Sequence, residues 1–130
     1  MIRKSPLFSR TLKACSIFAM ITGTMDVCLG IGMIDSTLGP IPTGSVAMAL
    51  VDSQIRFLGA MWAGYGVMLW WTSSDLETRR TPLGLLAGIM FVGGLGRLAS
   101  GLRHGFSESW VQVAMLTELL GPVAMYSLGC

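Results

Sequence analysis

Charged residues are scarce in this sequence of 130 residues. Asp, Glu, Lys and Arg together make up 12% of the chain, against about 25% in an average soluble domain. Hydrophobic residues make up 52%, and the mean hydropathy is +0.66. Helices at the surface of a soluble protein carry a polar face, and the long apolar segments of this chain show no such face. The composition therefore predicts an integral membrane protein and argues against a soluble helical domain.

The residues that build most metal, nucleotide and catalytic sites are also few. His104 is the only histidine, and the three cysteines, Cys15, Cys28 and Cys130, form no even disulfide framework. Cys15 and Cys28 would lie about 20 Å apart along one helix, beyond the reach of a disulfide. The sequence contains no metal-ligand spacing, nucleophile elbow or Walker loop. We expect no metal, no cofactor and no nucleic-acid partner, and the sequence gives little support for enzymatic activity.

Four segments are long and apolar enough to be considered as membrane-spanning helices. Each reaches the roughly 17–25 residues that such a helix needs. The first segment follows a basic opening, MIRKSPLFSRTLK, but it is longer than the roughly 7–15 apolar residues of a signal peptide and it carries Asp26. We interpret it as a retained helix, with a cleaved signal peptide as the alternative. The prediction is one all-α domain over residues 1–130, an integral membrane four-helix bundle with short loops and spans at about residues 14–34, 46–72, 83–102 and 110–128.

The distribution of basic residues predicts how the spans are oriented. The N-terminal tail has four basic residues and no acid, the connection over residues 35–44 has no Lys or Arg, and the next connection carries Arg79 and Arg80. Cytoplasmic loops are enriched in Lys and Arg. The predicted topology therefore has cytoplasmic N- and C-termini, with the second connection also cytoplasmic.

Five charged residues fall inside the apolar segments: Asp26, Asp52, Arg56, Arg97 and Glu118. At the centre of a membrane helix each would cost roughly 2.5–3.5 kcal/mol, so we expect them to pair or to lose their charge. At about 1.5 Å per residue, the predicted topology places all five in the outer half of the bilayer. We predict one polar cluster there, in which Arg97 pairs with Glu118, and Arg56 pairs with Asp52 or Asp26. Because three acids face two arginines, one carboxyl group is expected to be protonated, or a cation or donor ligand to bind.

The stretch FVGGLGRLASG, residues 91–101, contains the spacing of a dinucleotide-binding turn, Gly94-x-Gly96-x-x-Ala99. That motif works only after a buried strand in a βαβ unit, which a helical membrane chain lacks. Small residues let membrane helices approach closely, so the glycines are interpreted as packing residues around Arg97. The predicted packing glycines are Gly59, Gly66, Gly93, Gly94 and Gly96, and Ser100 shares the face of Arg97.

Pro122 follows Glu118 by four residues in the last segment. Proline has no backbone N–H, so the carbonyl of Glu118 loses its usual donor. We predict a kink at Pro122, which is as compatible with a transport site as with an inert membrane helix.

Two sequence blocks resemble a known family. They are Asp52-x-x-x-Arg56-Phe57-x-Gly59-x-x-Trp62 and Gly93-Gly94-x-Gly96-Arg97-x-x-Ser100, followed by Glu118. The chain from about Ile17 onward resembles the small four-helix bacterial membrane proteins catalogued as domain of unknown function 4345. Ala60 stands where a second glycine is expected. The resemblance implies a four-helix integral membrane fold with these polar residues as its signature, and it implies no activity.

Three functions remain open from the sequence. The first is a non-catalytic accessory or scaffold subunit of the bacterial inner membrane, whose buried charges fix the helix register. The second is an oligomeric transporter coupled to protons or cations, with Glu118 or Asp26 as the proton carrier. The third is a lipid- or quinone-binding membrane protein. The expected partners are membrane lipid, other membrane proteins or a second copy of this chain, and a small ligand of unknown identity.

Overall fold

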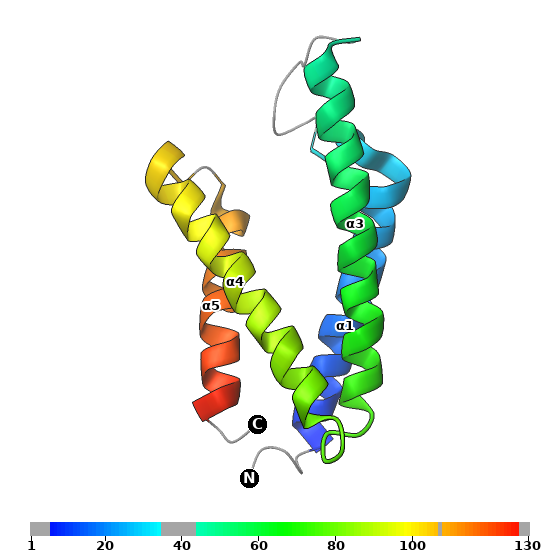
Figure 1. The fold of residues 1–130 in the computed structure, drawn as a ribbon, viewed down its shortest axis with the longest axis vertical. Coiled ribbons are helices and arrows are strands. Elements are labelled where there is room, and N and C mark those ends of the chain that lie inside the picture. The colour runs from blue at the N-terminus through cyan, green and yellow to red at the C-terminus, as the bar shows by residue number, and fades with distance from the viewer. Residues whose placement is uncertain (1–5, 35–43, 107, 128–130) are drawn as a thin grey trace. The chain divides into compact units, whose positions relative to one another are not determined.

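The chain folds into helices and no strands over the residues that the structure describes, 6–34, 44–106 and 108–127. In this computed structural model, four long helices follow one another: α1 (Pro6–Leu29), α3 (Val46–Ser73), α4 (Arg80–His104) and α5 (Ser109–Ser127), with a short 3-10 helix, η2 (Gly30–Met33), after α1 (Figure 1). The expected all-α class is therefore found throughout the described part of the chain.

The helix ends are set by local signals that are partly visible in the sequence. The hydroxyl of Ser45 accepts a hydrogen bond of 3.1 Å from the N–H of Met48, as expected of a serine at a helix N-terminus. Pro82 lies in the first turn of α4, where its missing N–H has little cost. The helix α1 begins at Pro6, eight residues before the apolar segment, so that Arg10 and Lys13 are helical.

The chain divides into two compact units, which we describe separately. One consists of residues 10–71 and holds most of α1 and all of α3 except its last two residues; the other consists of residues 1–9 and 72–130 and holds α4 and α5. The predicted single domain over residues 1–130 stays a prediction.

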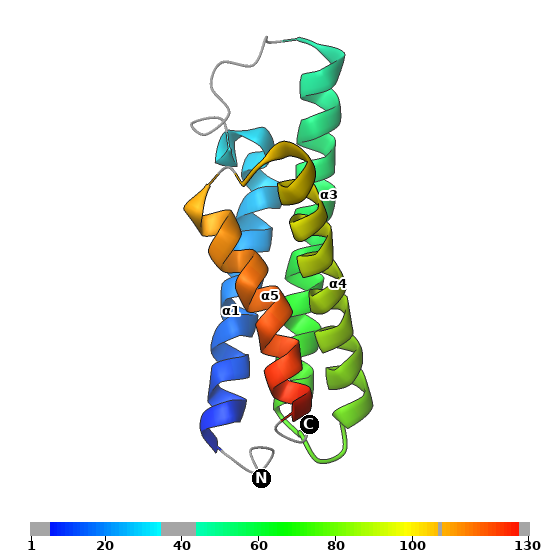
Figure 2. The ribbon, with the colours of Figure 1, turned by 90° about the vertical axis from the view of Figure 1, so that its left-hand side faces the viewer.

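The helices α1 and α3 run side by side and touch through glycines (Figures 1 and 2). A Cβ atom added at Gly23 would lie 2.5 Å from the carbonyl oxygen of Gly59 and from the backbone nitrogen of Ala63. At Gly66 the same atom would lie 2.8 Å from the carbonyl oxygen of Ser16. The hydroxyl of Ser16 donates a hydrogen bond of 2.8 Å to the carbonyl of Gly66, which joins the two helices at this second close contact.

The helices α4 and α5 form the core of the other unit. Leu83, Leu86 and Ala87 of α4 are buried, as is Met115 of α5. Gly94 lies against α5, where an added Cβ would come within 2.9 Å of the side chain of Leu119. The hydroxyl of Tyr126 donates a hydrogen bond of 2.8 Å to the carbonyl of Gly84, which fixes the C-terminal end of α5 against α4.

Two helical segments are long and apolar enough to cross a membrane. They are Pro6–Met33 and Arg80–His104, judged by length and composition. The predicted topology of four spans goes further and stays a prediction.

The contact at Gly66 predicts different effects of one substitution at two neighbouring glycines. We expect Gly66→Ala to lower the free energy of unfolding by about 1–3 kcal/mol, since the new methyl group must displace backbone atoms of α1. Gly64→Ala should leave stability unchanged or raise it by up to about 1 kcal/mol, because no atom of the described residues, other than the neighbouring backbone of α3, lies within 4 Å of its Cβ position. Unfolding in mild detergent, followed by circular dichroism, measures both. Equal effects at the two positions would contradict the packing of α3 on α1 at Gly66.

Candidate functional site

The polar residues predicted from the sequence lie in two groups, one in each unit. The first group holds Asp26, Asp52 and Arg56, on α1 and α3, and the second holds Arg97, Ser100 and Glu118, on α4 and α5. The prediction that both groups form one cluster in the outer half of a bilayer stays a prediction.

Arg56 links the C-terminal end of α1 to α3. Its Nη1 donates hydrogen bonds to the carbonyls of Val27, at 2.6 Å, and Cys28, at 3.2 Å. These carbonyls belong to the last turn of α1, where carbonyl groups receive no hydrogen bond from N–H groups of the same helix. A cation at a helix C-terminus is also favoured by the helix dipole. Arg56 therefore closes the end of α1 from a position on α3.

Asp52 holds Arg56 and the turn after α1 at the same time. The Nε of Arg56 donates to Oδ2 of Asp52 at 2.8 Å, and the N–H of Ile31 donates to Oδ1 at 2.9 Å. The two side chains are 44% and 30% exposed, so the ion pair lies at the edge of the helix contact. Arg56 is thus paired with Asp52, one of the two partners that the sequence left open.

Gly30 is the residue around which this end of α1 turns. Its φ of +55° lies in the left-handed region, which glycine adopts without strain and which commonly ends helices. An added Cβ would collide with Oδ1 of Asp52 and would lie 2.8 Å from Nη2 of Arg56. The backbone conformation and the space beside the ion pair both require glycine here.

Asp26 lies one turn before Gly30 on α1 and packs against Gly59. A Cβ at Gly59 would come within 2.5 Å of the Cβ of Asp26. No hydrogen bond or ion pair joins the Asp26 carboxylate to another residue in the described part of the chain. The acid predicted as an alternative partner of Arg56 is therefore left without a cation in this unit.

Arg97 pairs with Glu118 across the contact of α4 with α5. Nε of Arg97 donates to Oε2 of Glu118 at 2.9 Å and to Oε1 at 3.1 Å. The side chain of Glu118 is 12% exposed and that of Arg97 is 40% exposed. The two terminal nitrogens of Arg97 have no acceptor among residues 72–106 and 108–127. Arg97 therefore keeps donors that a ligand, a lipid or another helix can use.

The residues around this pair differ in how closely they are packed. Gly94 contacts α5, whereas nothing lies within 4 Å of the Cβ positions of Gly93 and Gly96 in the described chain. Ser100 is exposed one turn after Arg97. The predicted packing role of Gly93 and Gly96 stays a prediction, and so does the kink at Pro122, which is buried within α5.

A polar contact between α1 and α3 at Trp62 was not predicted from the sequence. Nε1 of Trp62 donates to the hydroxyl of Thr22 at 2.9 Å, and that hydroxyl donates to the carbonyl of Phe18 at 2.8 Å. The Trp62 ring stacks on Tyr65 with their centroids 5.3 Å apart. The position of Trp62 in the Asp52-to-Trp62 block is the one signal in the sequence that pointed to it.

The described residues of the two units offer no metal centre. Across the described residues, no group of three or more His, Cys, Asp or Glu side chains could hold a metal ion.

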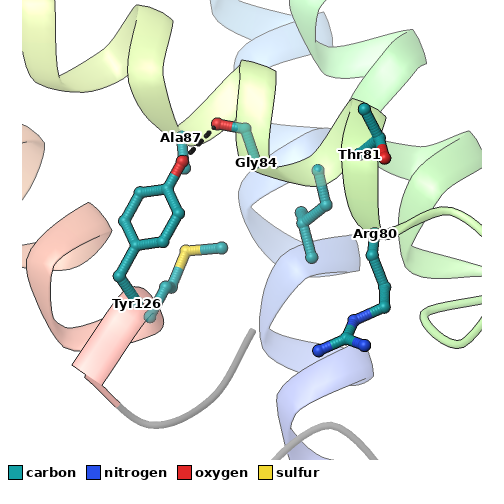
Figure 3. Close-up of a pocket in the computed structure, with 7 residues that line it drawn as sticks. Arg80, Thr81, Gly84, Ala87 and Tyr126 are labelled. Atoms are coloured by element: carbon teal, nitrogen blue, oxygen red, sulfur yellow. Dashed lines mark hydrogen bonds between the residues drawn. The ribbon is translucent and has the colours of Figure 1, made fainter.

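One cavity of about 180 Å³ opens between the N-terminal part of α4 and the C-terminal part of α5 (Figure 3). Its lining residues are Arg80, Thr81, Leu83, Gly84, Ala87, Met125 and Tyr126.

Comparison with known families gives one match. Residues 8–128 match the family described as "Domain of unknown function (DUF4345)". No curated protein and no solved structure matched the chain.

The Arg97–Glu118 pair predicts a measurable coupling between two substitutions. In a double-mutant cycle of Arg97→Gln and Glu118→Gln, we expect a coupling of about 0.5–1 kcal/mol, the range for an ion pair with one exposed partner. Unfolding of the four proteins in detergent gives the values. The same cycle with Arg103→Gln, on the same helix but outside the pair, should give none. Additive effects of Arg97→Gln and Glu118→Gln would contradict the pair.

Proposed function

We propose a function for this chain, which belongs to the DUF4345 family, as the two sequence blocks predicted. It is a four-span protein of the bacterial inner membrane that serves as a non-catalytic accessory or scaffold subunit. In this proposal both termini and the connection between α3 and α4 are cytoplasmic. The exposed helix faces contact lipid and other membrane proteins.

Exposed apolar side chains on all four long helices support a membrane location. Phe18 of α1, Leu58 of α3, Ile89 of α4 and Leu120 of α5 are 60–63% exposed. Soluble monomers rarely expose large contiguous apolar patches, whereas lipid-facing surfaces are apolar. The lack of Lys and Arg in residues 35–44, against Arg79 and Arg80 after α3, supports the orientation.

The accessory function rests on how the charges are used. Asp52 and Arg56 hold the end of α1, and Arg97 and Glu118 hold α4 on α5. Four of the five charged residues in the apolar segments thus join helices of their own unit. This use of intramembrane charge fits a protein whose task is to present a defined helical surface to a partner.

A second function, proton-coupled transport, is favoured by Asp26. Unpaired carboxyl groups within membrane helices mark proton and ion pathways. Asp26 is the acid that lacks a cationic partner among the described residues of its unit, whereas Glu118 is paired. Asp26 rather than Glu118 is then the proton carrier, in an oligomer.

The four-span topology predicts which side of the membrane each connection faces. On a background with all three cysteines changed to Ser, Thr37→Cys should react with a membrane-impermeant maleimide in intact bacterial spheroplasts. Glu77→Cys should react only after the cells are opened, because residues 74–79 are placed in the cytoplasm. The protein should also stay in the membrane pellet at alkaline pH. Labelling of Glu77→Cys in intact spheroplasts, or release into the supernatant, would refute the topology.

The accessory and transport functions predict different behaviour of the purified protein. As an accessory subunit, the chain should migrate with a larger membrane protein after extraction in mild detergent. Its proteoliposomes should take up no ethidium, a cationic dye, when a pH gradient is imposed. As a transporter, it should take up ethidium, and Asp26→Asn should abolish the uptake.

Asp75→Asn provides the matched control for Asp26→Asn. Asp75 lies in the connection between α3 and α4, where a hydrogen bond from the Thr78 hydroxyl, followed by one from the Thr78 N–H, lowers the pKa of its carboxyl group. That carboxylate stays ionised at neutral pH and carries no proton, so uptake should persist in this variant. Loss of uptake in both variants would point to a damaged fold rather than to a proton carrier.

A further inference from the structure

The cavity between α4 and α5 has mostly apolar walls. Leu83 and Ala87 of α4 are buried at 3% and 4% exposure, and Met125 and Tyr126 of α5 line the space with them, together with Gly84, Thr81 and Arg80. A cavity of about 150 Å³ with apolar walls binds benzene, so the 180 Å³ here has room for about six or seven carbon atoms. A drug-sized ligand needs roughly 300 Å³ or more. The space therefore suits a short length of hydrocarbon rather than a whole cofactor.

Tyr126 forms one wall of this cavity. Its hydroxyl donates to the carbonyl of Gly84, which holds the ring against α4 at one side of the space (Figure 3). A Cβ at Gly84 would lie 3.4 Å from that hydroxyl oxygen, so the contact is close. The polar tip of Tyr126 is thus satisfied by the helix, and the ring serves as an apolar wall.

Arg80 lies at the other side of the cavity, with its side chain across from Tyr126 (Figure 3). The residue is exposed, and its guanidinium has no acceptor in the described part of the chain. Asp75, one of the two acids in the connection before α4, is engaged by Thr78. A guanidinium is suited to bind a phosphate group through paired hydrogen bonds. The site therefore joins an anion-binding group to an apolar space.

The position of the cavity along α4 and α5 identifies the ligand class. Arg80 is the first residue of α4, and Tyr126 is one residue from the end of α5. In the proposed topology both ends lie at the cytoplasmic surface, where headgroups meet acyl chains. Basic pockets between membrane helices on this side bind anionic lipid headgroups.

We propose that this cavity binds an anionic phospholipid of the cytoplasmic leaflet, with its phosphate on Arg80 and the first carbons of one chain between Ala87 and Tyr126. The inference rests on the proposed membrane location. It adds a ligand class and a binding site in the α4/α5 unit, away from the Arg97–Glu118 pair. The bound lipid anchors the cytoplasmic end of the two helices in one leaflet.

Native mass spectrometry of the purified full chain tests the proposal with three probes: dioleoyl phosphatidylglycerol, dioleoyl phosphatidylcholine and glycerophosphoglycerol. We expect phosphatidylglycerol to bind in preference to phosphatidylcholine. Arg80→Gln should weaken phosphatidylglycerol binding about tenfold, the usual effect of losing a hydrogen bond to a charged group. Arg103→Gln removes the same charge from the other end of α4 and should have no effect. Glycerophosphoglycerol, which has no acyl chains, should not compete.

A cavity-filling variant tests the apolar part of the site independently. Ala87→Leu should weaken binding of phosphatidylglycerol severalfold. If the leucine side chain unfolds the unit, Ala87→Val takes its place and should weaken binding to a smaller degree. Ile89→Leu, on the exposed side of α4, is the control. Any of three outcomes would overturn the proposal. The first is an equal loss of phosphatidylglycerol binding in Arg80→Gln and Arg103→Gln, and the second is full binding by Ala87→Leu or Ala87→Val. The third is competition by glycerophosphoglycerol.

The two proposals fail in different ways. If maleimide labelling shows the four-span topology but the two dioleoyl lipids bind equally, the lipid site is wrong and the membrane protein stands. If the chain leaves the membrane at alkaline pH, the proposed function is wrong, and any binding of phosphatidylglycerol then reflects a soluble lipid-binding protein.

Discussion

The hydrogen bonds of Arg56 to the last turn of α1 are the constraint on which the α1/α3 unit depends. A helix end leaves carbonyls without donors, and in an apolar environment such groups are costly. Arg56 satisfies two of them, while Asp52 orients Arg56 and binds the following turn. These contacts fix where α1 stops and which turn of α3 lies beside it.

The glycine contacts follow from that fixed register. Gly23 lies two turns before Gly30 on α1 and meets Gly59 and Ala63, which lie after Arg56 on the antiparallel α3. A shift of one residue along either helix would place a larger side chain in a space that admits none. The unit is therefore held by polar contacts at one end and by close backbone approach along its length, and each requires the other.

The α4/α5 unit is held in a different way, by two polar contacts far apart on the same pair of helices. Arg97 and Gly84 are 13 residues apart on α4, about 20 Å at 1.5 Å per residue, and they contact Glu118 and Tyr126 of α5. Gly94 lets α5 approach between these two points. Two separated contacts define both the spacing and the register of the helices.

The sequence predicted those features that depend on helical periodicity alone. Gly59 and Gly66 were predicted as packing residues, and in the structure both lie against α1. Periodicity does not say where a helix stops, so the left-handed Gly30 and the carbonyl acceptors of Arg56 were not foreseen. The cavity was missed for a similar reason, because it depends on how the end of α5 meets the start of α4.

The contacts that build the two units also show which polar groups they leave over. The carboxylate of Glu118 is bound to Arg97, whereas its carbonyl lacks its helical donor because of Pro122. Asp26, Arg80 and the terminal nitrogens of Arg97 have no such partners in the described chain. Polar groups that stabilise a fold are ordinarily paired within it. An unpaired charged residue is costly in an apolar segment, so its presence there needs another reason. A ligand or partner is therefore to be sought at the unpaired groups, and the paired charges explain how the helices that present them are held.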